Sequence, residues 1–289
     1  MRNSDDILTL VAISDTQQST ACNMIISVLL TCFNRREHTL ECLRSMARQN
    51  PCGATLHYYL VDDGSTDGTA ETVAREFPDV RILQGDGSLY WCGGMRLAWQ
   101  TAVGSDPDYY LLLNDDTHLY PTALATLLDI TKSPESEIIA VGAICDAETG
   151  IFTYGGIRRF KGSISPTGKE EICDTFHANC VIIPRAVYLK IGTLHHRYTH
   201  GMGDFDYGLQ ATMRGMKVIQ SAEFIGTCSS NPVTGTWRDR NLSRRARWCL
   251  LNSKKTLPFL EWMEFNRRNS GIKWPLYTIS PWIQILLKR

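Results

Sequence analysis

Acidic side chains gather at two points along the chain, and each group directly follows an apolar run. Asp62 and Asp63 come after residues 56–61, and Asn114-Asp115-Asp116 come after residues 109–113. In open α/β sheets, ligands bind at the carboxyl ends of the strands. Adjacent carboxylates there hold a divalent cation, and the cation holds a pyrophosphate. The pattern predicts a site for a nucleotide and its metal, although polar residues in such turns also cap the helix that follows.

A further pair of carboxylates, Asp204 and Asp206, lies near the start of a predicted helix. A carboxylate at such a place is able to act as a general base that takes the proton of an attacking hydroxyl group. The alternative interpretation is that both side chains only cap the helix.

A glycine-rich loop, residues 85–96, precedes another predicted helix and contains Gly94 and Arg96. Glycines at such a place let the backbone approach a ligand, and the helix N-terminus favours anions. A dinucleotide fingerprint would have to follow the first strand directly, and none does. We therefore expect this loop to line a donor-sugar pocket, with Arg96 near the pyrophosphate. Tyr90 and Trp91 are equally compatible with a place in the core.

The elements that must position these residues alternate along the first half of the chain. Apolar runs predict strands, and apolar residues at helical spacing predict helices between them. Such alternation is typical of an α/β domain with a mainly parallel sheet that helices cover on both faces. The predicted strands lie at 25–33, 56–61, 80–83, 109–113, 138–144 and 176–184, and the predicted helices at 36–49, from about 69, at 93–103, after Pro121, at 184–191 and from an N-cap at Asp204.

The pattern changes after residue 145, and we divide the chain into three parts. Residues 1–23 are an extension of unassigned role, 24–234 form the catalytic domain, and 235–289 are an irregular helical tail. Residues 150–168 are rich in Gly, Ser and Thr and predict a hairpin or loop. The tail carries 12 Lys+Arg, 3 Asp+Glu and five of the seven Trp, although the whole chain has no net charge.

The basic, Trp-rich tail leaves two interpretations open. It is suited to an anionic membrane surface or an anionic acceptor, and equally to a solvated basic face with its Trp packed on the core. Zero net charge disfavours nucleic-acid binding. No apolar stretch reaches the roughly 18 residues that span a bilayer, and Asp5 and Asp6 argue against a secretory signal. The ten Cys include no C-x-x-C pair, which argues against a structural zinc site. We expect reduced thiols in a cytoplasmic protein. On the membrane interpretation, the tail makes a peripheral contact with the inner face of the cell membrane.

Four segments together resemble the family 2 glycosyltransferases, which share the GT-A fold. Residues 26–35 resemble the opening strand of that family, 61–69 its second signature, Asn114-Asp115-Asp116 its metal-binding D-x-D motif, and 203–206 its catalytic-base motif. The segments occur in the family's order over residues 24–228. The tail is similar to that of a bacterial subgroup that builds polysaccharides.

The resemblance implies a role for each matching residue. Asp62 would read the imide N–H of a uracil or thymine ring, because an ionised carboxylate is an acceptor. Asp116 would bind Mg²⁺ or Mn²⁺ with help from Asn114 or Asp115, and Asp204 would be the base, with Asp206 orienting the loop or the acceptor. The remaining residues expected to line the nucleotide and donor site are Thr31, Asn34, Arg35, Asp63 and Ser65.

The chain departs from the family pattern at three points. Asn114 replaces the usual first Asp of the metal motif, and Gly203 replaces a Glu that many relatives have before the base. Some relatives also supply a His after the base motif, but no His follows His200; Cys228, Asn231, a water or the Arg residues of the tail would take its place. Trp91, His177 and Asn179 are expected to face the acceptor, and a metal site at the loop histidines His195, His196 and His200 is disfavoured.

The reading that joins these features is an inverting, metal-dependent glycosyltransferase. It would move a sugar from a UDP- or dTDP-linked donor to a glycan or lipid-linked acceptor in surface polysaccharide synthesis. A sugar-phosphate nucleotidyltransferase would show a Gly-rich, basic loop after the first strand, where this chain has Thr-Cys-Phe-Asn-Arg-Arg. A non-catalytic nucleotide or carbohydrate binder would tolerate loss of the metal-binding carboxylates or of the base, yet this chain has candidate residues for both.

Overall fold

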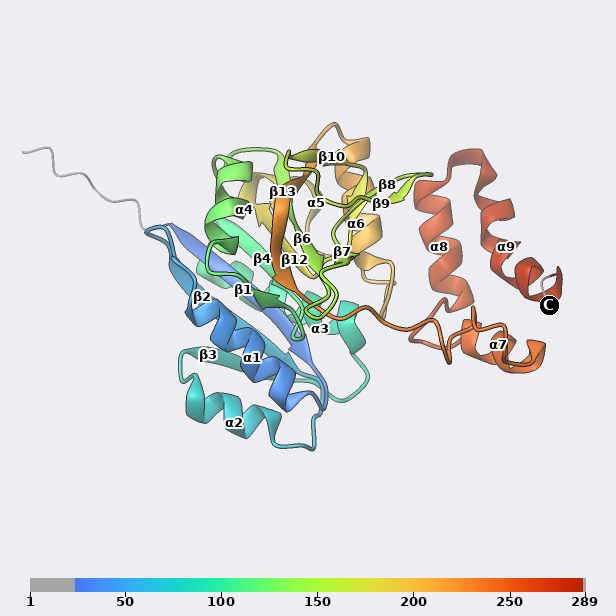
Figure 1. Cartoon of the computed structure of the whole chain (residues 1–289), viewed down its shortest axis with the longest axis horizontal. Coiled ribbons are helices and arrows are strands. Elements are labelled where there is room, and N and C mark those ends of the chain that lie inside the picture. Colours follow the sequence, from blue (N-terminus) through green and yellow to red (C-terminus); the bar gives the residue numbers. More distant parts are fainter. Residues whose placement is uncertain (1–23, 288–289) are drawn as a thin grey trace, which may run out of the picture.

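A mixed β-sheet forms the centre of the protein (Figure 1). The computed structural model describes residues 24–287, so the extension predicted at 1–23 lies outside the described residues. Within the described range the sheet has ten strands, with β5 (His118–Leu119) and β7 (Phe152–Tyr154) attached at the side of the main order β10-β13-β6-β12-β4-β1-β2-β3. The strands of the main order are β1 Ile25–Cys32, β2 Thr55–Asp62, β3 Val80–Gln84, β4 Tyr109–Leu113, β6 Ile138–Cys145, β10 Glu171–Cys173, β12 Cys180–Pro184 and β13 Lys217–Thr227.

The half of the sheet formed by β1 to β4 is parallel. These strands are apolar runs without polar alternation, as expected for strands covered on both faces. The register pairs Cys32 with Asp62 and Val28 with Leu111. The carboxyl ends of β1, β2 and β4 therefore reach the same edge of the sheet, and the two acidic clusters arrive there together.

Helices cover both faces of the sheet. On one face, α1 (Arg36–Ala47), α2 (Thr69–Glu76) and α4 (Ala123–Thr131) bury their apolar sides against the strands. On the other, α3 (Tyr90–Ala102), α5 (Arg185–Ile191) and α6 (Gly203–Met213) do the same around Trp99, which is fully buried. Apolar residues at spacings of three and four produce these buried stripes, as the sequence predicted.

The other half of the sheet differs from the mainly parallel sheet that the sequence predicts. Strand β12 runs antiparallel to both β4 and β6. The eleven-residue strand β13, which pairs with β6, was missed altogether. Its polar residues and the register shifts between Gln220 and Gly226 break the period-two pattern that marks a strand.

Two predicted boundaries are also wrong near the candidate base. The single strand predicted at 176–184 is two strands, β11 (Thr175–Phe176) and β12, separated by His177–Asn179. Strand β11 belongs to a small second sheet with β8 (Gly156–Arg158) and β9 (Gly162–Ser163). Strands β7 (Phe152–Tyr154), β8 and β9 lie in the hairpin region predicted at 150–168. Helix α6 begins at Gly203 with Met202 as N-cap, so Asp204 lies in its first turn instead of capping it.

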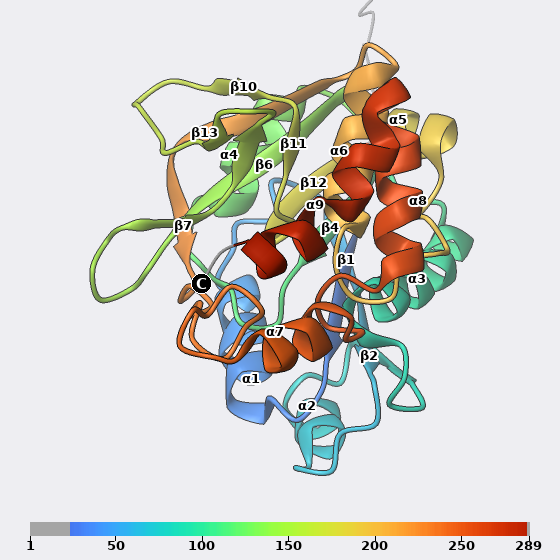
Figure 2. The ribbon, with the colours of Figure 1, turned by 90° about the vertical axis from the view of Figure 1, so that its right-hand side faces the viewer.

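The tail folds into three helices beside the sheet: α7 (Arg244–Leu251), α8 (Phe259–Asn269) and α9 (Trp274–Leu287). Seen from the side, they stand in front of the edge of the catalytic domain (Figure 2). Trp237 and Trp282 are buried in a cluster of their own, and Trp262 packs towards Tyr198 and Met202 of the domain. Over residues 24–287, no helix has both the length and the apolar composition that a bilayer crossing requires, and none of the cysteines there is paired in a disulfide.

Candidate functional site

A cavity of about 380 Å³ opens at the edge of the sheet where β1, β2 and β4 end. Five residues that the sequence assigned to the site line it: Thr31, Arg35, Asp63, Trp91 and Asp115. The other assigned residues do not line this cavity. Six further residues do: Gly87 and Tyr90 belong to the glycine-rich loop that was expected to line a pocket, whereas Cys32, Phe33, His200 and Lys255 were not predicted.

Arg35 holds the two carboxylates that follow β4. Its Nη1 donates to Oδ1 of Asp115 at 3.3 Å, and its Nη2 donates to Oδ2 of Asp116 at 2.6 Å. Despite partial burial, the two carboxylates raise the pKa of Arg35, so it stays charged. The second oxygen of Asp116, Oδ1, is buried and has no hydrogen-bond partner among the described residues. An anionic oxygen without a partner is unfavourable, so this atom marks a place for a cation.

Asp115 lies deeper than Asp116, with 5% of its surface exposed. Burial raises the pKa of Asp115 to about 7. Arg35 opposes this shift, and Asp116 adds to it through charge repulsion. Asp115 is therefore only partly ionised near pH 7.

Asn34, Ser65 and Asp62 join the loops after β1 and β2. The backbone N–H of Asn34 donates to Oγ of Ser65, and that of Thr66 donates to Oδ1 of Asn34. Asp62 is 1% exposed, and its Oδ1 accepts from the backbone N–H of Ser65 at 2.8 Å. These contacts fix the loop that forms one wall of the cavity, which agrees with the turn-forming alternative and leaves the base-reading role of Asp62 a prediction.

Asp63 shapes the glycine-rich loop. Its carboxylate accepts hydrogen bonds from the backbone N–H groups of Gly87, Leu89 and Tyr90, at 2.9, 3.2 and 2.8 Å. This arrangement places a carboxylate at the N-terminus of α3, where the helix dipole favours negative charge. It also starts the helix at Tyr90, three residues before the predicted start.

The rest of α3 approaches β1 very closely. A Cβ atom added to Gly94 would lie 2.1 Å from Oγ1 of Thr31, so only glycine fits there. Trp91 donates from Nε1 to Oδ1 of Asn114 at 2.8 Å, and Asn114 is the residue that replaces the usual Asp of the metal motif. A neutral amide oxygen at this position therefore serves to hold the indole over the site.

Asn179 and Cys228 lie behind the acidic cluster. Asn179 is 4% exposed and donates from Nδ2 to Oγ1 of Thr117 and, at 3.6 Å, to Sγ of Cys228. Cys228 and Asn231 line a smaller cavity of about 250 Å³ with Arg35 and Asp116. Thus two of the four alternatives for the missing His line the same cavity as Asp116.

Asp204 sits in the first turn of α6, at the junction with α3. Its oxygens accept from the backbone N–H groups of Phe205, at 2.9 Å, and Ala178, at 3.2 Å. Burial raises the pKa of Asp204, and His177 opposes the shift. Gly203 explains why no Glu precedes this residue, because an added Cβ would lie 2.6 Å from Sγ of Cys92. The close contact packs the first turn of α6, which carries the candidate base, on the first turn of α3, which carries Tyr90 and Trp91.

His177 stands next to this base. It packs edge-on between the rings of Tyr154 and Phe205, with centroids 5.4 and 5.2 Å away. Burial lowers its pKa, and Asp204 opposes the effect. An imidazole that stays neutral beside a carboxylate leaves that carboxylate free of an ion pair.

Asp206 and Arg96 are engaged in fixing the structure around the site. Asp206 is 2% exposed; Nε of Arg268 donates to both its oxygens, and Nδ2 of Asn269 donates to Oδ1 at 2.7 Å. These bonds tie α6 to α8. Arg96 donates from Nη1 to the carbonyl oxygens of His195 and Tyr198, which holds the loop before α6.

The tail reaches the cavity through two lysines that the sequence did not single out as site residues. Lys255 lines the cavity, and Nζ of Lys254 lies 5.8 Å from the ring centroid of Tyr90. Burial, together with Lys255, lowers the pKa of His200. These adjacent lysines, in the short loop between α7 and α8, are the sequence feature that could have predicted this contact, since adjacent cations in a short loop suit an anionic ligand.

Residues 27–190 match the family model described as glycosyl transferase family 2. The match covers more than half of the 289 residues. The chain belongs to glycosyl transferase family 2. The family resemblance of the four sequence segments is thereby confirmed, whereas the bacterial polysaccharide subgroup stays a prediction. No curated protein matches the sequence.

Solved structures of other proteins share the fold of this family 2 chain. A mannosyltransferase, PcManGT from Pyrobaculum calidifontis in complex with GDP-Man and Mn²⁺, is 15% identical with a TM-score of 0.52, over 91% of this chain and 70% of that one. TarS residues 1–349 from S. aureus is 16% identical with a TM-score of 0.52, over 91% of this chain and 81% of that one. At these identities the likeness concerns the fold, and the predicted GT-A-like α/β architecture is confirmed.

The metal question depends on the residues after β4. Among residues 24–287, no group of three or more His, Cys, Asp and Glu side chains is placed to hold a metal ion. Two carboxylates with one unpartnered oxygen nevertheless fit a cation that takes its other ligands from substrate phosphates and water, as Mg²⁺ commonly does.

The buried Asp115 predicts an unusual dependence of stability on pH. Its pKa in the folded protein lies above the value of about 4 in an unfolded chain, so folding takes up a proton between these values and stability falls as the pH rises from about 4 to about 7. Asp115→Asn should therefore be more stable than the parent at pH 8, by roughly 1–3 kcal/mol, and equal to it near pH 4. Urea unfolding with EDTA present measures the difference.

The exposed Asp129 of α4 provides the control for this test, since Asp129→Asn should change stability equally at both pH values. A loss of stability in Asp115→Asn at pH 8 would show instead that its ion pair with Arg35 outweighs the cost of burial.

Proposed function

We propose that this protein is an inverting glycosyltransferase that moves one sugar from a nucleoside diphosphate to a hydroxyl group of a glycan or lipid-linked acceptor. The observation that supports the proposal most is the contact between two helix starts. Gly203, before the candidate base Asp204, packs on Cys92 in the first turn of α3, and that turn carries Tyr90 and Trp91 into the cavity beside Asp115. Donor site and base thus share one wall.

The proposed step needs one proton acceptor. The acceptor oxygen attacks the anomeric carbon from the side opposite the diphosphate, its proton passes to Asp204, and the bond from the anomeric carbon to the phosphate oxygen breaks. The nucleoside diphosphate leaves with the electron pair of that bond, and the configuration inverts. A base works best when its pKa lies near the working pH, and the raised pKa of Asp204 moves it in that direction.

A divalent cation, Mg²⁺ or Mn²⁺, is proposed at Asp116 and Asp115. When bound, it would neutralise charge that develops on the departing diphosphate. Asp116 offers its unpartnered Oδ1, and Asp115 and the second oxygen of Asp116 become available when Arg35 turns away from them. The guanidinium of Arg35 is then free to bind a phosphate, since Arg forms paired hydrogen bonds with phosphate oxygens.

The donor is proposed to be a nucleoside-diphosphate sugar whose phosphates lie between Arg35 and Lys255. Both residues line the cavity, and they approach it from opposite ends of the chain. The similar structure from P. calidifontis holds GDP-Man and Mn²⁺, which supports this class of donor. The sequence resemblance favours UDP or dTDP through Asp62, and surface polysaccharide synthesis as the setting, so the nucleotide base is the first matter to test.

Helix α9 supports a peripheral contact with an anionic membrane. One stripe of the helix is buried, and another exposes apolar side chains: Leu276, Ile279, Ile283, Leu286 and Leu287 are 66, 45, 42, 56 and 77% exposed. Their spacing of three or four residues puts them on one face. The sequence after Glu264 contains five Lys and Arg and no acidic residue. An apolar face beside positive charge is typical of helices that lie on anionic lipid.

Calorimetric titration with UDP, dTDP and GDP, each with and without Mn²⁺, tests the donor site. We expect one of them to bind in the presence of Mn²⁺, and Asp116→Ala to weaken that binding roughly tenfold or more, about 1.4 kcal/mol. Asp129→Ala on the far end of α4 is the control and should bind like the parent. Equal affinity without Mn²⁺ and in Asp116→Ala would refute the metal role, and failure of all three nucleotides to bind would favour the non-catalytic alternative.

Asp204→Asn tests the base. The amide keeps one oxygen, and so one of the two backbone hydrogen bonds that Asp204 accepts. It takes no proton, so transfer should fall roughly 100-fold or more while donor affinity stays unchanged. Release of nucleoside diphosphate in the presence of glycan and lipid-linked acceptors gives the rate, and calorimetry gives the affinity. A variant that transfers at the parental rate would place the base elsewhere.

Flotation with phospholipid vesicles tests the membrane contact. The protein should float with vesicles that contain phosphatidylglycerol and not with phosphatidylcholine alone, and added salt should weaken the association. Leu276→Asp combined with Ile283→Asp should reduce it roughly tenfold or more, because each buried leucine or isoleucine contributes about 1.5–3 kcal/mol. Leu189→Asp, an equally exposed leucine on α5, is the control. Parental protein that stays unbound to either vesicle would end this part of the proposal.

A further inference from the structure

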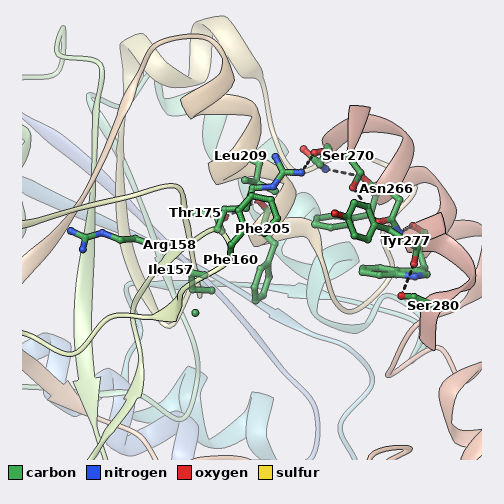
Figure 3. Close-up of a pocket in the computed structure, with 15 residues that line it drawn as sticks. Ile157, Arg158, Phe160, Thr175, Phe205, Leu209, Asn266, Ser270, Tyr277 and Ser280 are labelled. Carbon is green, nitrogen blue, oxygen red and sulfur yellow. Dashed lines mark hydrogen bonds between the residues drawn. The ribbon is translucent and has the colours of Figure 1, made fainter. Parts of the chain in front are cut away.

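A second cavity, of about 310 Å³, lies between the catalytic domain and the tail. Figure 3 shows its two walls, one formed by Phe160, Phe205 and Leu209 and the other by α8 and α9 with Tyr277. Trp262 and Phe265 of α8, whose rings stack with centroids 5.4 Å apart, complete the second wall. None of these residues belongs to the donor cavity.

The lining of this cavity suits an apolar ligand. Liquid water occupies about 30 Å³ per molecule, so the space would hold roughly ten waters. Aromatic and aliphatic side chains form much of the wall, and the amides of Asn266 and Asn269 are engaged in hydrogen bonds within the protein. Its volume lies in the range of small-molecule pockets, which are mostly apolar with a few polar groups. Arg159 also lines it, with its guanidinium over the ring of Phe160 and donating to the carbonyl oxygen of Asn269. The guanidinium of Arg158 pairs with Glu171 and points away from the cavity (Figure 3). The chemistry therefore fits a hydrocarbon chain attached to an anionic group.

The cavity adjoins the acceptor side of the candidate base. Phe205 follows Asp204 directly in α6, and its ring forms part of the cavity wall while packing on His177. The donor cavity lies on the other side, at the first turn of α3. A molecule held here would stand next to the proton acceptor without competing with the nucleotide.

The cavity is also continuous with the exposed apolar stripe of α9. Tyr277 and Ser280 of this helix line the cavity, and Leu276 and Ile279, their immediate neighbours, are exposed on its outer side. A chain that leaves a membrane at the outer face of α9 would pass directly to the wall that Tyr277 forms.

We infer that this cavity binds the hydrocarbon chain of a membrane-borne acceptor that carries a phosphate group. The inference rests on the proposed function, because it specifies which acceptor the transferase uses. Arg159 at the cavity meets the phosphate, the chain lies against Phe160, Phe205 and Phe265, and the sugar-accepting end reaches Asp204.

Calorimetry with alkyl phosphates below their micelle concentration tests the inference without any transfer reaction. Each buried methylene is worth roughly a fourfold gain in affinity, so decyl phosphate should bind at least roughly tenfold more tightly than hexyl phosphate. Inorganic phosphate should bind too weakly to detect. Ser280→Trp puts an indole into the cavity and should abolish the preference for decyl phosphate. Gln284→Trp, which adds the same group to an exposed position of α9, should keep it.

The outcomes separate this inference from the proposed function. Equal binding of hexyl and decyl phosphate, or equal loss in Ser280→Trp and Gln284→Trp, would overturn the inference even if nucleotide binding and sugar transfer are intact. Chain-length-dependent binding that Ser280→Trp removes would support it even in a protein without transfer activity. A concentration-dependent dimer that Leu276→Asp with Ile283→Asp dissociates would also overturn it, because a second copy of the chain would then cover this face.

Discussion

The first turn of α3 must lie closer to its neighbours than ordinary side chains permit, and the site depends on that close approach. Gly94 lets the helix meet Thr31 of β1, and Gly203 lets α6 meet Cys92. Asp63 holds the start of the helix through three backbone N–H groups. The start of α3 thus joins the strand proposed to bind the donor to the helix that carries Asp204, the proposed base. A side chain larger than hydrogen at either glycine would push these parts of the site away from one another.

The carboxylates of the site differ in what satisfies them, and this difference indicates their work. A buried carboxylate is unfavourable unless hydrogen bonds or opposite charges meet it. Asp63 is met by backbone N–H groups, and Asp206 by Arg268 and Asn269. Asp115 and Asp116 share Arg35, and Thr39 also donates to Asp115. One oxygen of Asp116 has no partner among residues 24–287. The first two have their hydrogen-bonding capacity used within the protein, whereas the acidic pair after β4 keeps capacity for a ligand.

The sequence predicts those parts of the fold that local patterns determine. The strands β1, β2 and β4 are continuous apolar runs, and their ends carried the acidic clusters to the expected edge. Strand β13 escaped prediction because bulges interrupt its alternation. Lys255 escaped assignment because its place in the donor cavity follows from the path of the tail, which no local pattern encodes. The partners of Asp206 are more than sixty residues away in α8 and were invisible for the same reason.

The hydrogen bonds of Asp206 with Arg268 and Asn269 join α6, which carries the proposed base, to α8 of the tail, so the two helices should move together. The division at residue 235, drawn from composition, therefore does not mark where the molecule can be cut. A chain ending there would leave a buried carboxylate without its cation and remove one wall of the second cavity. Anyone who exchanges tails between relatives to change acceptor choice would have to carry Arg268 and Asn269 along with the new α9. Acceptor choice and the position of the base would then be inherited together.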